Sequence, residues 1–349
     1  MATQPTSTMT GALTEIWERV LQQSPIGPDD NFFDLGGDSL TAVTLFLEIE
    51  KLCGRQLPTV MIYNAPTISA LAAELERPAT SRFPPLFLLR PGRQAPPVFI
   101  AHGLGGSVID FYRLLTYIES DNAIYGMQAR GTDGVETALE TIEEMAQYHL
   151  DAIRELQPSG PYLLVGYSLG GLVCLEIAQR LIASGEKVAL LAMLDAYPFR
   201  KYLSWFQRLR LSTRLALKKV SMAIGMSAQK GEEQSPTSPA ELHAKMSAGR
   251  KINVRNQQPV GLLTPAMERS AEVSKEALRR YRPKFYPGRV RFARAAVVTD
   301  FPADPVAVWS RLAEKFDLET VPGDHLGMIA THPDALGAVI SRYLKEATK

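Results

Sequence analysis

Residues 162–183 read YLLVGYSLGGLVCLEIAQRLIA, and this stretch decides the fold of most of the chain. A short apolar run leads into GYSLG at 166–170, and a helical pattern follows without a break. A serine on a sharp strand-to-helix turn needs small residues two positions before and after it, and Gly166 and Gly170 supply them. Ser168 then starts a helix, where the dipole and free N–H groups favour developing negative charge. The stretch therefore predicts an exposed nucleophile.

Outward from that stretch, short apolar runs alternate with helical patterns. Five runs are predicted strands: VFIA at 98–101, AIYGM at 123–127, YLLVG at 162–166, VALLAML at 188–194 and FARAAVV at 292–298. Runs of this kind separated by helices indicate βαβ units and a mostly parallel sheet. Residues 199–282 interrupt the alternation with a basic amphipathic segment, a polar Ser/Pro stretch and more helix. An insertion of this size between strands is typical of a lid or of a disordered loop.

A serine nucleophile needs a base, and the chain holds five histidines: His102, His149, His243, His325 and His332. In α/β-hydrolases the order along the chain is serine, acid, histidine, with the histidine on a loop after the last strand. His325, in VPGDHLGM, has that place and is the predicted base. His102 belongs to a glycine-rich loop and is expected to be structural. The other three histidines are expected to be exposed.

Two aspartates compete for the place of the acid. Asp195 ends the apolar run at 188–194, and Asp300 follows the run at 292–298. Either strand end can present a carboxylate that orients the imidazole and stabilises the imidazolium. The general hydrolase arrangement favours the later strand. The residue pattern by itself leaves both open.

Residues 84–346 resemble the type I thioesterase domains that terminate nonribosomal peptide and polyketide assembly lines. In that family the acid commonly follows the earlier strand, just before the lid, and MLDAYP at 193–198 matches that context. The resemblance therefore favours Asp195. An oxyanion hole should use the backbone N–H of Leu169, the residue after the nucleophile, and one N–H from the loop AHGLGG. By resemblance the second donor is Leu104, with Gly103 as the alternative.

The first part of the chain has a different pattern, of helices separated by turn-rich loops. The sequence DNFFDLGGDSL at 30–40 ends in two glycines followed by Asp38 and Ser39, where a helix is predicted to start. Glycines permit a tight turn and the close approach of another molecule, which suits covalent modification of the serine. The plain alternative is that Asp38 or Ser39 only caps the helix.

FFDLGGDSL resembles the phosphopantetheine attachment motif of peptidyl and acyl carrier domains, and the similarity covers about residues 10–77. It implies a four-helix bundle with 4′-phosphopantetheine attached to Ser39, and Asp38 helping a phosphopantetheinyl transferase to recognise the site. The form of the motif leans towards the peptidyl type and leaves the polyketide type open. A thioester on such an arm would be the substrate of Ser168.

Composition limits the remaining function classes. Residues 1–77 carry ten acidic and four basic side chains, whereas the net charge of the whole chain is only +1. An acidic small domain beside a basic larger one favours mutual docking or a basic partner for the acidic part. Cys53 and Cys174 are the only cysteines, and no zinc spacing is present, so neither a disulfide framework nor a metal site is expected. Neither a nucleic-acid nor a membrane partner is expected, and the expected location is cytoplasmic.

The predicted organisation is an all-α carrier bundle at 10–77, a Pro-rich linker at 78–85 and an α/β-hydrolase domain at 86–346 with a lid at about 199–282. The predicted activity is release of an acyl or peptidyl chain, by hydrolysis or cyclisation. Upstream synthase and adenylation modules are the expected partners. Two alternatives stay open: a proofreading hydrolase that clears wrongly loaded carriers, and a module that binds acyl chains without catalysis.

Overall fold

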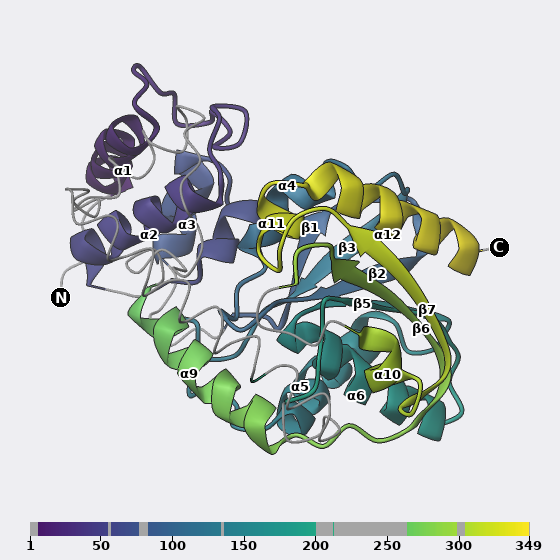
Figure 1. Cartoon of the computed structure of the whole chain (residues 1–349). Helices are drawn as coiled ribbons and strands as arrows, with labels where there is room; N and C mark the ends of the chain where they lie inside the picture. The colour runs from purple at the N-terminus through teal and green to yellow at the C-terminus, as the bar shows by residue number, and fades with distance from the viewer. Residues whose placement is uncertain are drawn as a thin grey trace, which may run out of the picture.

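The computed structural model has a small helical domain that packs against one end of a larger α/β domain (Figure 1). The structure describes residues 6–54, 57–76, 83–133, 136–199, 212, 264–298 and 304–348. The predicted fold class is confirmed, with helices first and then a mostly parallel sheet flanked by helices. Within the described ranges, no helix has the length and apolar character that a membrane crossing needs.

The helical domain follows the predicted apolar spacing. Its elements are α1 (Thr6–Leu21), α2 (Ser39–Cys53), η1 (Thr59–Tyr63) and α3 (Ile68–Glu76). The Trp17 ring, fully buried, meets the Phe32 ring edge-on at 5.4 Å. The third element is a short 3₁₀ helix, because Pro58 precedes it and Pro66 follows soon after, which leaves no room for a longer helix. Gly54 ends α2 in the left-handed conformation, which glycine adopts readily.

In the part of the chain that the structure describes, the sheet has seven strands in the order β1-β3-β2-β4-β5-β6-β7, of which only β1 is antiparallel to its neighbour. The strands are β1 (Leu86–Arg90), β2 (Gln94–Ala101), β3 (Asn122–Met127), β4 (Tyr162–Tyr167), β5 (Val188–Leu194), β6 (Tyr286–Ala295) and β7 (Ala313–Val321). The central strand β4 is buried along its whole length. This burial explains its continuous apolar run, since both faces of a parallel sheet are covered.

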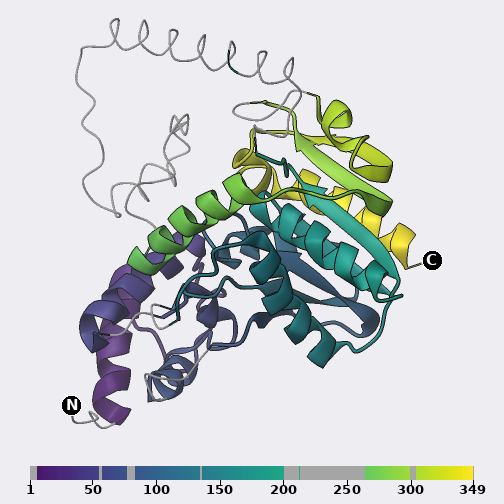
Figure 2. The same cartoon turned by 90° about the horizontal axis from the view of Figure 1, so that it is seen from below.

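Helices cover both faces of the sheet (Figure 1). One face carries α5 (Ile142–Leu156), α6 (Leu169–Ala183) and α10 (Pro305–Trp309), and the other carries η2 (Ile109–Phe111), α4 (Tyr112–Leu115), α11 (Gly327–Ala330) and α12 (Pro333–Ala347). A further helix, α9 (Pro265–Arg280), runs from beside the helical domain along α5 (Figure 2). The result is a three-layer α/β/α domain.

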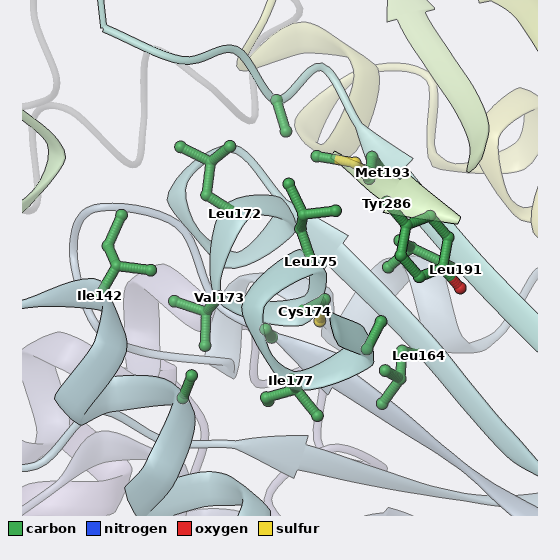
Figure 3. Packing of buried hydrophobic residues seen from close by; sticks show 14 of the residues in the cluster. Ile142, Leu164, Leu172, Val173, Cys174, Leu175, Ile177, Leu191, Met193 and Tyr286 are labelled. Atoms are coloured by element: carbon green, nitrogen blue, oxygen red, sulfur yellow. The ribbon is translucent and has the colours of Figure 1, made fainter. Parts of the chain in front are cut away.

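The first two turns of α6 are wrapped in apolar side chains on every side (Figure 3). Leu172, Val173 and Leu175 of this helix pack among residues of β4, β5 and α5. Cys174 is fully buried, as predicted, and its Sγ donates to the carbonyl of Val165 at 3.4 Å. Burial raises the pKa of this thiol, so it stays a neutral packing group. This rigid core fixes the start of α6, where Ser168 lies.

The helical domain docks on the segment that follows β2. Phe33, from the loop before α2, stacks on Tyr112 of α4 with ring centroids 4.2 Å apart and planes 15° apart. The hydroxyls of Thr59 and Ser107 lie 3.3 Å apart and are both buried. Ile109 of the sheet domain packs into the core of the helical domain. The contact therefore couples the two domains through aromatic and apolar side chains.

Three strand assignments differ from the sequence analysis. The strand at 86–90 was not predicted, and the strand at 313–321 was predicted without bounds. The strand predicted from residue 292 begins earlier, at Tyr286. The strands at 86–90 and 313–321 are the two edges of the described sheet. The strand at 313–321, AEKFDLETV, mixes charged with apolar residues and lacks the apolar run that marks a buried strand. The strand at 86–90, LFLLR, has such a run at 86–89, directly after the Pro-rich linker, and it was missed. Of the predicted lid, only Phe199, Ser212 and the residues from Thr264 onward are described, and the amphipathic segment otherwise lies outside the described residues.

Candidate active site

Ser168 lies on a strained turn between β4 and α6. Its backbone has φ 55° and ψ −118°, and its N–H donates to the carbonyl of Leu194 at 2.9 Å. A Cβ on Gly166 would lie 2.3 Å from the carbonyl oxygen of Gly170, and a Cβ on Gly170 would lie 2.3 Å from that of His102. Both positions therefore require glycine, as the motif predicted. Strain of this kind is stored where the surrounding structure fixes the residue, as in active sites.

Three predicted residues from distant parts of the chain meet at this turn. The Ser168 hydroxyl lies 3.1 Å from Nε2 of His325, and Nδ1 of His325 lies 2.8 Å from Oδ2 of Asp195. The carboxylate makes Nδ1 the protonated nitrogen, so Nε2 can accept the proton of the serine. Asp300, the competing acid, lies outside the described residues. The geometry is that of a serine–histidine–aspartate triad, and the catalytic role of each residue stays a prediction.

Asp195 is held in place by the sheet. It follows β5 with φ 47°, and its N–H donates to the carbonyl of Ala293 at 2.7 Å. Its Oδ1 accepts the N–H of Ala295 at 3.2 Å, which leaves Oδ2 to the imidazole. The residue is only 4% exposed, so the carboxylate and the imidazole interact in a site with little water. The acid is therefore fixed at the end of a central strand.

Two tyrosines contact the triad, and the sequence analysis missed both. The Tyr167 hydroxyl donates to the backbone carbonyl of His325 at 2.8 Å, although the two residues are 158 positions apart. Tyr197 is buried and its hydroxyl makes a side-chain hydrogen bond with Asp195. Both tyrosines lie inside motifs that the sequence analysis quoted, GYSLG and MLDAYP. Their partners depend on tertiary contacts, which the motifs do not encode.

The predicted oxyanion-hole groups flank Ser168. Leu169 is the first residue of α6, where backbone N–H groups have no acceptor within the helix. Leu104 lies in the loop after β2, and it is half-buried. That loop turns tightly, because the N–H of Gly106 donates to the carbonyl of Gly103 at 3.2 Å. Leu169 follows Ser168 directly, and a Cβ on Gly103, the neighbour of Leu104, would lie 3.8 Å from Cβ of Ser168. The role of these N–H groups in holding an oxyanion stays a prediction.

The other histidines differ from one another. His102 is buried, as expected for a structural residue, and its Nδ1 bonds to the carbonyl of Gly103 at 2.6 Å. His149 is also buried, with its ring 6.3 Å from that of His102, so the prediction that it is exposed was wrong. It lies four residues after Met145 on the face of α5 that packs on the core. Burial lowers the pKa of His102 to about 4 and that of His149 to about 3.

Of the remaining two histidines, His332 precedes α12 and is half-buried, whereas it was expected at the surface. Its ring carbon Cδ2 lies against Gly323, at the turn after β7, which accounts for its partial burial. His243 lies outside the described residues. Neither histidine is part of the triad geometry.

The second predicted site is the start of α2, which begins at Ser39. Asp38 caps this helix, because its side chain accepts the N–H of Thr41 at 2.8 Å and Thr41 Oγ1 accepts the N–H of Asp38 at 2.7 Å. A Cβ on Gly37 would lie 2.3 Å from the Phe32 ring, so only glycine fits there. The sequence left open whether Asp38 or Ser39 caps this helix, and the structure shows that Asp38 does.

Comparison with known proteins identifies both domains. Residues 96–346 match the thioesterase domain family, and residues 11–75 match the phosphopantetheine attachment site. The dimodular nonribosomal peptide synthase of Bacillus subtilis (strain 168) is 42% identical over 187 residues, which are 53% of this chain and 8% of that protein. The nonribosomal peptide synthetase pngA of Aspergillus terreus is 30% identical over 284 residues, which cover 78% of this chain and 30% of that protein. The chain thus spans less than a third of these relatives.

Solved structures share the fold. A four-domain nonribosomal peptide synthetase, holo-AB3403 bound to AMP and glycine, matches 98% of this chain and 26% of its own with a TM-score of 0.57 and 22% identity. The type II thioesterase BorB from the borrelidin biosynthetic cluster matches 74% of this chain and 97% of its own with a TM-score of 0.52 and 19% identity. The chain therefore belongs to the thioesterase family: a domain for covalent phosphopantetheine attachment is followed by a thioesterase domain, and its relatives are nonribosomal peptide synthases.

Proposed function

We propose that this chain releases an acyl or peptidyl group from the phosphopantetheine arm of its own carrier domain through an ester on Ser168. One observation carries the proposal: Ser168, His325 and Asp195 form a hydrogen-bonded relay, with contacts of 3.1 and 2.8 Å. The relay lies in a domain against which the carrier domain packs directly. A thioester on the carrier and a nucleophile for it are thus joined in one chain.

Ser39 is the proposed attachment residue for the arm. It begins α2, and Asp38 supplies the cap of that helix, so the helix start does not depend on a serine hydroxyl. Gly36, with φ 85°, and Gly37 keep the preceding turn tight. These residues fit a site that an external transferase must reach. When bound, the arm presents the acyl group as a thioester, whose carbonyl carbon is the electrophile.

The first half of the proposed reaction transfers the acyl group to the enzyme. Oγ of Ser168 attacks the carbonyl carbon while its proton passes to Nε2 of His325. Asp195 keeps Nδ1 protonated and stabilises the imidazolium. The N–H groups of Leu169 and Leu104 are the proposed donors to the oxygen that gains negative charge. The carbon–sulfur bond then breaks, and His325 gives its proton to the leaving sulfur.

The second half frees the product. His325 takes a proton from water or from a nucleophile within the acyl chain, which attacks the seryl ester, and then returns that proton to Oγ of Ser168. Water gives an acid, whereas an internal nucleophile gives a ring that is lighter by one water. The predicted lid at about 199–282 is proposed to choose between them by limiting the access of water.

The same proposal includes the partners and the domain bounds. A phosphopantetheinyl transferase would modify Ser39, and upstream synthase modules with adenylation activity would supply the acyl or peptidyl group. The proposed carrier domain spans 10–77, the linker 78–85 and the thioesterase domain 86–346, and most of that linker lies outside the described residues. The start of β1 at Leu86 supports the last boundary.

Intact-mass analysis tests the proposal. A transferase and a defined acyl-coenzyme A load the carrier with one acyl-phosphopantetheine group, and the mass of the chain is then followed with time. The parent should lose the acyl mass and keep the arm, whereas Ser168→Ala should keep both. Ser310→Ala, which alters an exposed serine, serves as the control and should behave as the parent. A loss of at least a thousandfold is expected for Ser168→Ala.

Each alternative function predicts a different result. If the parent holds its acyl group as long as Ser168→Ala does, the module binds acyl chains without catalysis. If the parent clears short or foreign acyl groups much faster than long ones, the proofreading function is favoured. If Ser168→Ala clears the carrier as fast as the parent, another nucleophile acts and the proposal is wrong.

A further inference from the structure

We infer that Tyr167 is a positioning residue for the base. From the end of β4, directly before Ser168, it holds His325 next to the serine. The inference rests on the proposed function of His325. Tyr167 immediately precedes Ser168 and ends β4, so its backbone is fixed in the most buried strand of the sheet. A residue that Tyr167 contacts is therefore fixed in position relative to Ser168.

Tyr167 contacts His325 in two ways. Its hydroxyl donates to the backbone carbonyl of His325 at 2.8 Å. Its ring also stacks on the imidazole, with centroids 4.9 Å apart and planes 21° apart. The hydrogen bond fixes the backbone of His325, and the stack fixes the plane of its ring. Asp195 bonds to Nδ1 of the same ring, so the two residues hold the imidazole at different points.

The position of the tyrosine ring is itself defined by its surroundings. A Cβ on Gly103 would lie 3.1 Å from two carbons of this ring, so the loop after β2 packs closely on it. Phe111 meets the ring edge-on at 6.4 Å. Tyr167 is 8% exposed, and burial holds the pKa of its phenol well above the usual range, so the hydroxyl remains a donor. One ring thus contacts the nucleophile turn, the base and the predicted oxyanion loop.

The base needs such a contact because it lies on a loop. His325 lies on the loop after β7. In that loop Asp324 accepts hydrogen bonds from the N–H groups of Gly327 and Met328, which join the loop to α11 and not to β4. The hydroxyl of Tyr167 joins this loop to the nucleophile strand. A misplacement of about 1 Å in a catalytic group can cost about a hundredfold in rate. Loss of one hydrogen bond should cost less, about tenfold.

Tyr167→Phe is the direct test, because it removes the hydroxyl and keeps the ring. With a soluble acyl thioester as substrate, kcat should fall about tenfold and KM should stay unchanged. Tyr162→Phe is the matched control: Tyr162 lies on the same strand, is fully buried, and its hydroxyl donates to the backbone carbonyl of Gln157 at 3.1 Å. This variant should lose similar thermal stability and keep the parental kcat.

A double-mutant cycle separates positioning from general structural support. In the His325→Ala background, Tyr167→Phe should cause no further loss of the residual rate, because its effect passes through the imidazole. An equal loss in both backgrounds would overturn the inference, as would a parental kcat for Tyr167→Phe or an equal fall for Tyr162→Phe. If His325→Ala itself keeps the parental rate, the proposed base is wrong and the inference fails with it. That failure can be told apart from a failure of the inference alone, since it appears in the single variant His325→Ala, in which Tyr167 is unchanged.

Discussion

Two serines, Ser39 and Ser168, each stand at the start of a helix after a glycine-containing turn, yet their surroundings differ. Ser39 begins α2 after Asp38, which caps the helix from an extended conformation. Ser168 precedes α6 with a strained φ of 55°, and no side chain caps that helix. A histidine nitrogen lies 3.1 Å from the hydroxyl of Ser168. Ser39 lies on the small helical domain, whereas Ser168 lies on the turn after β4, the most buried strand of the sheet.

The difference teaches what turns a serine into a nucleophile. A serine hydroxyl is weakly nucleophilic at neutral pH and needs a neighbouring base. Ser168 receives one from a loop 157 positions away, which only the folded sheet brings close. For Ser39 we propose the opposite arrangement, in which an external transferase brings its own catalytic groups. The proposed role of Ser168 follows from the base that the fold places beside its hydroxyl.

The largest expected effect is that two different reagents each label only one of the two serines. A transferase with coenzyme A should add one phosphopantetheine to the parent and to Ser168→Ala, and none to Ser39→Ala. A fluorophosphonate should add one phosphonyl group to the parent and to Ser39→Ala, and none to Ser168→Ala. Intact mass reads both labels. Any crossing, such as phosphopantetheine on Ser39→Ala, would break the comparison.

The next effect concerns the acid that supports Ser168. Asp195→Asn should lower kcat on a soluble thioester by roughly 10³- to 10⁴-fold, because the amide no longer holds the Nδ1-protonated tautomer. Asp300→Asn should retain most of the parental rate. Steady-state kinetics of both variants, each with its melting temperature, give the answer. The reverse ranking would move the acid to the later strand.

A smaller effect is expected at the contact between the domains. Tyr112→Ala removes the ring on which Phe33 stacks, so the carrier should dock less well. Release of an acyl group from Ser39 should slow by about tenfold, whereas hydrolysis of a soluble thioester should not change. Tyr117→Ala, at a 42% exposed tyrosine nearby, is the control and should alter neither rate. Equal losses on both substrates would mean that Tyr112 supports the active site and not docking.

The smallest effect concerns Asp38, which both caps α2 and is proposed to guide the transferase. Asp38→Ala should lower the free energy of unfolding of the carrier domain by about 1 kcal/mol, measured in urea. Asp38→Asn should keep most of that stability, because asparagine caps a helix about as well. If the charge also guides recognition, Asp38→Asn should still be primed several-fold more slowly. Parental priming of this variant would leave Asp38 with the cap alone.

Sequence prediction succeeded where a feature depends on neighbours along the chain. The glycines at 166 and 170 and the capping at Asp38 could be predicted, because each depends on backbone within a few residues. It failed for His149, although its spacing from Met145 and Ile153 indicates the face of α5 that packs on the core, and for the edge strands at 86–90 and 313–321. The strand at 313–321 is half-exposed and mixes charged with apolar residues, so it lacks the continuous apolar run that marks a buried strand. The strand at 86–90 does have a short apolar run, LFLL, which directly follows the Pro-rich linker and was not recognised as a strand.

The sequence by itself determined the fold class, the two serines and the order of the candidate triad, because these follow from local periodicity and from motifs that allow one backbone path. Only the tertiary structure decided which groups meet. Parallel strands collect their carboxyl ends at one edge of the sheet, and this brings Asp195 and His325 to Ser168. The same packing places the Tyr167 hydroxyl on the carbonyl of His325. Contacts across more than a hundred residues depend on how whole layers pack, and no local pattern encodes them.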